Sequence, residues 1–124
     1  MYNETKVFNI NPMPKPRMVK SDAWKKRPIV LKYWAYKDEL NLYNNDFEIK
    51  NGMSYQFVIK MPNTWPKKKK AAMDGQPHIQ RPDLDNLIKA LWDCLMPEDS
   101  HIWKVCSIEK VWGYVGYIKI TGGY

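Results

Sequence analysis

The sequence is poor in cysteine, and acidic residues are outnumbered by basic ones. The two cysteines, Cys94 and Cys106, have no Cys or His neighbours at the spacing of zinc ligands. Their number and spacing exclude a cysteine-based zinc site and a disulfide framework. Because both lie among apolar residues, we expect two buried free thiols.

Long apolar runs are also absent. No stretch approaches the roughly 18 consecutive apolar residues that a membrane span requires. The N-terminal residues lack the apolar core of a signal peptide. We therefore expect a soluble, cytoplasmic protein with no membrane partner.

The imbalance of charge indicates an anionic partner. The 124 residues include 20 Lys and Arg against 13 Asp and Glu, which gives a formal net charge of +7. Nucleic acid is the commonest partner of a chain this basic, although a basic surface can also serve solubility alone. The length predicts a single domain over residues 1–124.

Apolar periodicity and turn residues predict a mixture of helices and strands. The expected helices cover residues 28–43, 66–73 and 86–95, and the expected strands cover 6–10, 53–61, 102–112 and 114–121. In the first helix the apolar positions are Ile29, Tyr33, Tyr36 and Leu40. The last two strands meet at Gly113, so we expect them to pair as a hairpin.

Acidic residues gather in one part of this basic chain. Residues 83–99 contain five Asp and Glu but one basic residue, Lys89. If residues 83–85 are extended, Asp83 and Asp85 point to the same side of the chain. Asp85 is then the expected N-cap of the following helix, and Lys89 lies one turn further along it.

These residue types suit phosphodiester cleavage with a divalent metal. Asp83, Asp85 and a third acid from residues 97–100 offer the oxygen ligands that Mg²⁺ prefers. Lys89 would stabilise developing charge or help to position the attacking water. A simpler interpretation stays open, in which Asp85 caps a helix and Lys89 forms a surface ion pair with Asp93.

The segment from Pro82 to Asp93 resembles the RusA family of Holliday junction resolvases. It contains the family's Asp-x-Asp-Asn-Leu-x-Lys-Ala core without a gap, and Lys60-Met61-Pro62 precedes it at the end of an expected strand. The resemblance implies an α+β fold with a small mixed sheet and two main helices. It also implies a homodimer, encoded by a phage or prophage in a bacterial host, that makes symmetrical nicks in four-way DNA junctions.

The resemblance further assigns catalytic and metal-binding residues. The family's two motif aspartates fall on Asp83 and Asp85, and its catalytic lysine falls on Lys89. The third catalytic aspartate best matches Asp99, with Glu98 as the alternative because the link after the helix is short. The implied cofactor is Mg²⁺ with Mn²⁺ as a possible substitute, held by the three acids.

Basic residues outside this segment are candidates for phosphate contacts that position DNA. They are Arg17, Lys20, Lys25, Lys26, Arg27, Lys67, Lys68, Lys69 and Lys70. Trp24 and Trp65 lie beside basic runs and either stack on exposed bases or serve packing. For His78 and His101 we expect a loop position and a sheet-edge position, with no metal ligation.

Two other classes of protein compete with the resolvase interpretation. One is a noncatalytic DNA-binding protein whose acids cap and solvate a helix. The other is a restriction-type nuclease, whose second acid and lysine usually lie two residues apart on a strand. Asp85 and Lys89 are four apart on an expected helix, which argues against that class.

Overall fold

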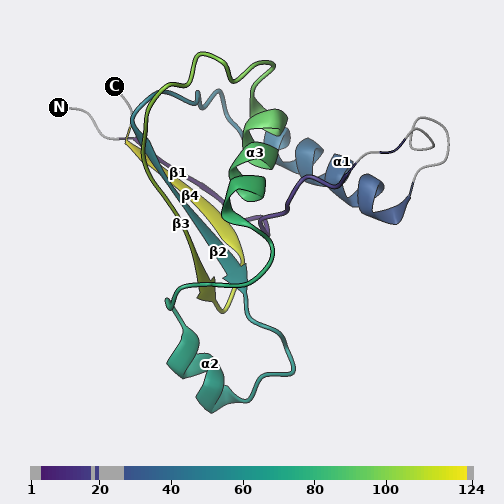
Figure 1. Cartoon of the computed structure of the whole chain (residues 1–124), viewed down its shortest axis with the longest axis vertical. Coiled ribbons are helices and arrows are strands. Elements are labelled where there is room, and N and C mark those ends of the chain that lie inside the picture. The colour runs from purple at the N-terminus through teal and green to yellow at the C-terminus, as the bar shows by residue number, and fades with distance from the viewer. Residues whose placement is uncertain (1–3, 18, 20–26, 123–124) are drawn as a thin grey trace.

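The chain forms a four-stranded sheet with two long helices on one of its faces (Figure 1). The computed structural model describes residues 4–17, 19 and 27–122. The strands are β1 (Thr5–Phe8), β2 (Met53–Lys60), β3 (Val105–Gly113) and β4 (Tyr117–Gly122). Their order is β1-β4-β2-β3, and parallel and antiparallel pairs both occur. The fold is therefore α+β with a mixed sheet, as predicted.

β2 is the apolar centre of the sheet. Met53, Tyr55 and Phe57 are buried on the face that the helices cover. Ser54 and Gln56 alternate with them and lie on the opposite, polar face. This two-residue alternation is what the sequence showed for residues 53–61.

The expected hairpin between the last two strands is wrong. β3 runs parallel to β2, and β4 runs antiparallel to β2 on its other side. The apolar β2 therefore has a backbone partner at each edge. A parallel pair needs a long connection, and residues 61–104 supply it.

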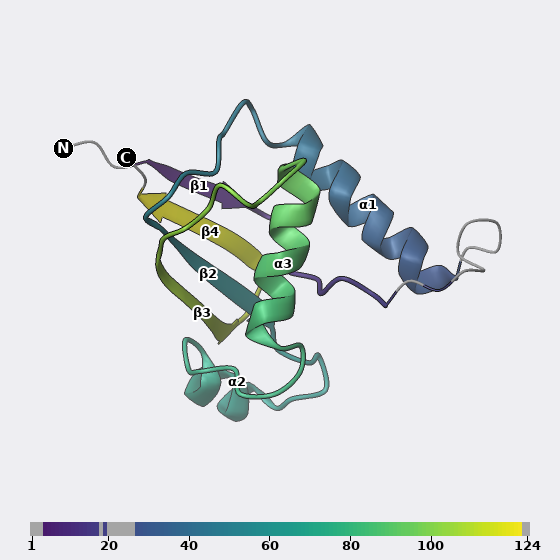
Figure 2. The ribbon, with the colours of Figure 1, turned by 45° about the horizontal axis from the view of Figure 1, so that its top comes forward.

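The long helices α1 (Pro28–Leu42) and α3 (Leu84–Leu95) pack against each other and over the sheet (Figure 2). On α1, Tyr33, Tyr36 and Leu40 are buried as predicted, but Ile29 is 44% exposed and Val30 is fully buried instead. Apolar side chains surround much of α1, so periodicity alone could not choose between neighbouring positions.

The short helix α2 (Lys67–Met73) lies beyond the end of the sheet in Figure 1. It follows Pro66 and ends before Gly75, whose φ of +78° favours glycine. The expected helix over residues 66–73 is thus confirmed. α2 itself buries no residue, so its attachment depends on the segments that flank it.

The two cysteines differ in exposure. Cys94 lies on the buried face of α3, and burial raises the pKa of its thiol. Cys106 is exposed, which corrects the expectation of two buried thiols. The β2–β3 register skips Cys106, because Val105 pairs with Met53 and Ser107 with Ser54. A residue at such a bulge loses the strict inward and outward alternation of a strand.

The histidines also depart from expectation. His101 lies in a turn before β3 and is exposed, so it is not a sheet-edge residue. His78 follows α2 in the loop, as predicted, but is only 3% exposed. Within the described ranges, no helix is long and apolar enough to cross a membrane.

Candidate active site

The acidic segment lies at the start of α3. Asp83 has extended backbone angles (φ −69°, ψ 145°) and is the N-cap, and the Leu87 backbone N–H donates to its carbonyl at 3.2 Å. The helix begins at Leu84, so Asp85 belongs to the first turn. The prediction of Asp85 as N-cap in an extended 83–85 segment is therefore wrong.

The earlier start of α3 changes how the carboxylates are oriented. Asp85 is held by the helix, and its Oδ1 accepts the backbone N–H of Asn86 at 2.9 Å. Asp83 is held by the turn that enters the helix. Both side chains are exposed, and the positive potential of the helix N-terminus favours negative charge at this position.

One face of α3 carries the charged residues. Asp85, Lys89 and Asp93 follow one another at four-residue spacing, so they share a helix face. The opposite face is buried against the sheet and α1, through residues that include Leu87, Ala90, Leu91 and Cys94. The amphipathic pattern therefore directs the charged row toward solvent, where a substrate can reach it.

A network of ion pairs continues this charged row. Lys89 Nζ lies 3.9 Å from Asp93 Oδ1 and 3.6 Å from Asp99 Oδ2. Lys15 Nζ lies 3.0 Å from Asp93 Oδ2 and brings the N-terminal segment alongside α3. Lys89 is thus the residue that joins the acidic loop after α3 to the helix face.

Asp99 and Glu98 have different environments. The Asp99 carboxylate is directed to the Lys89 ammonium group. Glu98 Oε1 accepts a hydrogen bond from Ser100 Oγ at 2.8 Å and lines a hollow with Phe47 and His101. Of the two acids, it is Asp99 that the structure brings to the charged face of α3.

A hollow of about 460 Å³ lies beside the N-terminus of α3. It is lined by Pro14, Arg81, Pro82, Asp83 and Asn86. This hollow combines a carboxylate, an arginine and the helix N-terminus, and it is open to solvent. The hollow therefore leaves Asp83 accessible at the start of the helix.

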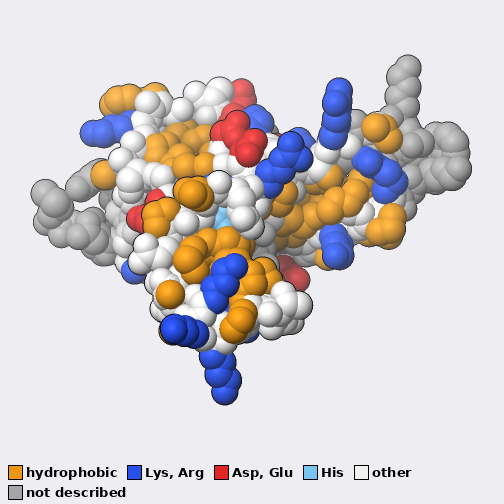
Figure 3. Space-filling model, turned by 60° about the horizontal axis from the view of Figure 1, so that its bottom comes forward, with side chains coloured by type: hydrophobic (Ala, Val, Ile, Leu, Met, Phe, Trp, Pro, Cys, Tyr) orange, Lys and Arg blue, Asp and Glu red, His pale blue; other side chains and the backbone are white. Residues whose placement is uncertain are grey.

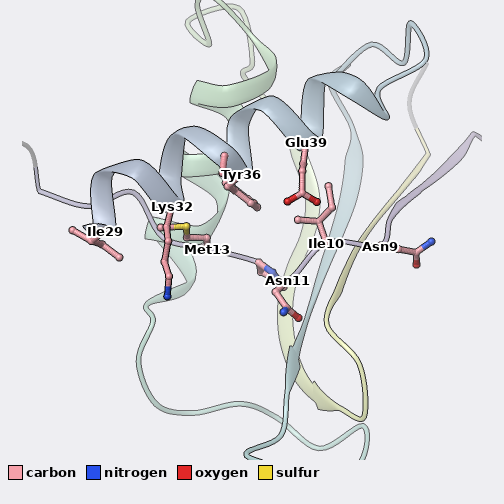
Figure 4. A pocket seen from close by; sticks show the side chains of 10 residues that line it. Asn9, Ile10, Asn11, Met13, Ile29, Lys32, Tyr36 and Glu39 are labelled. Carbon is pink, nitrogen blue, oxygen red and sulfur yellow. The ribbon is translucent and has the colours of Figure 1, made fainter. Parts of the chain in front are cut away.

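A larger hollow of about 610 Å³ lies between residues 9–13 and α1 (Figure 4). Lys32, Tyr36 and Glu39 line it from the helix side. Burial raises the pKa of Tyr36. None of the acidic residues of the 83–99 segment lines this hollow, so we do not place the catalytic chemistry there.

The carboxylates suit a hard cation by their chemistry. Asp83, Asp85 and Asp99 offer oxygen donors, which Mg²⁺ and Mn²⁺ prefer, and no thiol or imidazole competes among them. Among the described residues, no three Asp, Glu, His or Cys side chains lie close enough together to hold an ion. Mg²⁺ commonly binds through one or two carboxylates with substrate phosphates and water, so this arrangement still fits it.

α2 carries exposed basic side chains. Lys67, Lys68 and Lys69 on α2 are exposed, and Lys69 Nζ lies 4.1 Å from the centre of the Trp65 ring. The Trp65 ring packs on Trp112 at 4.7 Å, so the packing role expected for Trp65 is confirmed. Figure 3 shows one face with scattered Lys and Arg side chains and a group of acidic side chains near its upper edge, with smaller acidic patches elsewhere.

Of the other predicted DNA contacts, Arg17 and Arg27 lie together just before α1. The Arg27 guanidinium donates to the carbonyl of Arg17 at 2.6 Å, which ties together two of these basic residues. Lys70, at the end of α2, is half-buried. The remaining predicted residues, Lys20, Lys25 and Lys26, lie outside the described residues, as does Trp24.

Sequence reasoning missed the cluster that attaches α2 to the sheet. The His78 ring packs on Trp112 at 4.3 Å, and the His78 Nδ1 atom is buried without a hydrogen-bond partner. Burial and the nearby Lys110 charge lower the pKa of His78. No sequence pattern marks this cluster, because Trp65, His78 and Trp112 come from three separate segments.

An exposed face of α3 with acids and a lysine, carried on a mixed sheet in a basic chain, fits a small hydrolase that cleaves nucleic acid. Residues 9–121 match the family described as Endodeoxyribonuclease RusA, and the chain belongs to the RusA family. Members of this family are endodeoxyribonucleases that resolve Holliday junctions. Nucleases of this kind generally use divalent metal ions. The comparison with curated proteins gives no match.

Family membership confirms the resemblance drawn from residues 82–93. It also decides for the enzyme over a noncatalytic DNA-binding protein. The structure places Asp85 and Lys89 on a helix, which agrees with the argument against a restriction-type nuclease.

Proposed function

We propose that the chain is a Mg²⁺-dependent Holliday junction resolvase that acts as a homodimer and makes paired symmetrical nicks. Each 124-residue chain supplies a single catalytic domain, of phage or prophage type, that works in the bacterial cytoplasm. The proposal rests mainly on one observation. Asp85 and Lys89 share the exposed face of α3, and Asp99 forms an ion pair with Lys89 there.

The proposed division of roles follows from position. Asp83, Asp85 and Asp99 are the proposed metal ligands, and Mn²⁺ could replace Mg²⁺. Because no three such side chains cluster among the described residues, one or two of these carboxylates would hold the ion together with water and substrate phosphates. A divalent ion held by these residues would supply Lewis-acid chemistry, polarising a phosphoryl oxygen and making water a better nucleophile. The helix N-terminus adds backbone N–H groups that favour an anionic phosphate.

The contacts of Lys89 are compatible with a role in binding the phosphate during cleavage. Its ion pairs with Asp93 and Asp99 are long, at 3.9 Å and 3.6 Å, and its side chain is 58% exposed. Exposed pairs of this kind are weak, so the ammonium group can turn to a phosphate when DNA arrives. There it would stabilise the charge that develops during cleavage.

DNA binding is proposed to depend on the surrounding basic residues. Lys67, Lys68, Lys69, Arg17 and Arg27 would contact phosphates and position the junction without reading its sequence. Two symmetrical nicks require two active sites related by a two-fold axis, which is the reason for proposing a homodimer.

The proposal is tested with the Asp85→Asn variant on a synthetic four-way junction in Mg²⁺. We expect nicking to be lost while junction binding is retained, because the change removes one charge and preserves the shape of the side chain. Asp38→Asn is the matched control, since Asp38 is an exposed aspartate on α1 and is not part of the acidic segment. Undiminished nicking by Asp85→Asn would refute the assignment.

A further inference from the structure

Lys110 on β3 reaches across to the segment that leads into α3. Its Nζ donates to the carbonyl of Pro82 at 2.6 Å and also to the carbonyl of Gln80. Pro82 immediately precedes Asp83, the N-cap of α3. A lysine of the sheet therefore holds the main chain one residue before the first proposed catalytic aspartate.

The preceding residues are held to the sheet by their backbones. Residues 75–78 run along the end of β3, where Trp112 N–H donates to the Gln76 carbonyl at 2.9 Å and His78 N–H donates to the Lys110 carbonyl at 3.1 Å. Within the described chain, the next such bond is that of Leu87 N–H to the Asp83 carbonyl. The Lys110 side chain thus spans the interval between two backbone-bonded segments.

The residues of this interval have little else to hold them. Ile79 is 90% exposed, and Gln80 and Arg81 are exposed as well. Apolar burial therefore does not anchor the segment against the sheet. An ammonium group suits the task, because it offers three donors that can serve two converging carbonyls at once.

We propose that Lys110 is a positioning residue for the active site, which it serves by holding the 80–82 carbonyls and so placing Asp83 and the first turn of α3. The inference rests on the proposed function, in which Asp83 and Asp85 are catalytic. Lys110 acts through the backbone of residues 80–82 and need not touch the substrate.

The test compares Lys110→Met, which keeps the aliphatic stem without donors, with Lys110→Arg, which keeps donors. Lys119→Met is the control, since Lys119 is exposed on the neighbouring strand β4. Single-turnover nicking is measured at saturating protein and Mg²⁺, together with junction affinity. Amide hydrogen exchange of residues 83–87 is followed in the DNA-free protein.

We expect Lys110→Met to nick about 10- to 100-fold more slowly, which is the range found when a group behind a metal ligand is lost. Its junction affinity should stay within about twofold, as for a surface substitution. The amides of residues 83–87 should exchange faster. Lys110→Arg should recover much of the rate, and Lys119→Met should behave as the wild type.

Other results would overturn the inference. An unchanged nicking rate with unchanged exchange would show that Lys110 positions nothing. Weaker junction binding with a normal saturated rate would make Lys110 a phosphate contact instead. If the wild type itself does not nick, the proposed function fails, and the exchange data still decide whether Lys110 holds the segment. If Lys110→Met does not fold, Lys110→Leu, which also lacks a donor, takes its place under the same readouts.

Discussion

At the scale of single residues, the choice between Asp99 and Glu98 is open to a direct test. Asp99 lies 3.6 Å from Lys89, whereas Glu98 is bonded to Ser100. We predict that Asp99→Asn lowers nicking by more than the roughly 10- to 100-fold typical of a group behind a metal ligand. Glu98→Gln should change the rate by no more than about twofold. Steady-state nicking assays in Mg²⁺ measure the rates of both variants. A larger loss of rate in Glu98→Gln than in Asp99→Asn would make Glu98 the third catalytic acid.

Substitution of Lys89 should change the nicking rate strongly and the stability of the fold only slightly. Its ion pairs are exposed and long, so we predict that Lys89→Met changes the free energy of unfolding by less than about 1 kcal/mol. Nicking should nevertheless fall about 10²- to 10³-fold, as when a group that stabilises transition-state charge is removed. Thermal unfolding and nicking are measured on the same preparation. A large loss of stability would contradict the proposed role.

Because the pKa of His78 is lowered in the folded chain, we predict that the stability of the fold depends on pH. Burial and the Lys110 charge lower its pKa from the ordinary 6.5, so the unfolded chain takes up this proton first as pH falls. Stability should therefore decrease as pH drops below about 6.5, until the folded-state pKa is passed. In a thermal-unfolding series, His78→Phe should flatten this decrease. The exposed His101→Gln serves as control and should follow the wild type.

At the scale of elements, α2 is a lysine-bearing helix that buries none of its own residues. It is attached through its flanks, where the Trp65 and His78 rings pack on Trp112 of β3. This construction leaves Lys67 and Lys68 exposed, and it keeps them on a fixed support. α2 is therefore suited to contact phosphates rather than to stabilise the fold.

The contribution of α2 can be measured by salt dependence. We predict that the double variant Lys67→Gln, Lys68→Gln binds a four-way junction more weakly. The slope of log affinity against log salt should decrease by about 2, close to one for each phosphate that a lysine no longer neutralises. The unfolding temperature should change little, because both side chains are exposed. An unchanged slope would show that α2 does not bind DNA. The control is Lys119→Gln, which also replaces an exposed lysine by glutamine but lies on β4.

At the scale of the whole molecule, the proposed homodimer has two consequences. The mass in solution should be twice the 14.7 kDa of one chain. Dimers that combine one wild-type and one Asp85→Asn subunit should nick a single strand at the junction, because each site cuts one strand. Light scattering measures the mass, and a plasmid-borne junction distinguishes one nick from two. Paired nicks by a monomer would contradict the proposal.

The sequence predicted much of the fold and the core of the candidate site. The alternation in residues 53–61 predicted β2, and the apolar stripe after residue 84 predicted α3. These signals are local, since each depends on residues a few positions apart. The boundaries were less accurate: α3 begins at Leu84, so Asp83 and not Asp85 is its N-cap. Local propensity does not show which of two neighbouring aspartates a helix start will use.

By itself, the sequence determined the motif of Asp83, Asp85 and Lys89, the basic character of the chain and its place in the RusA family, because these are properties of consecutive residues. The tertiary structure decided that β2 separates β3 from β4 and that Lys89 meets Asp99. It also decided that Lys110 holds the approach to α3. Each of these depends on contacts between distant segments, which form only when the apolar faces of the sheet and helices are buried together.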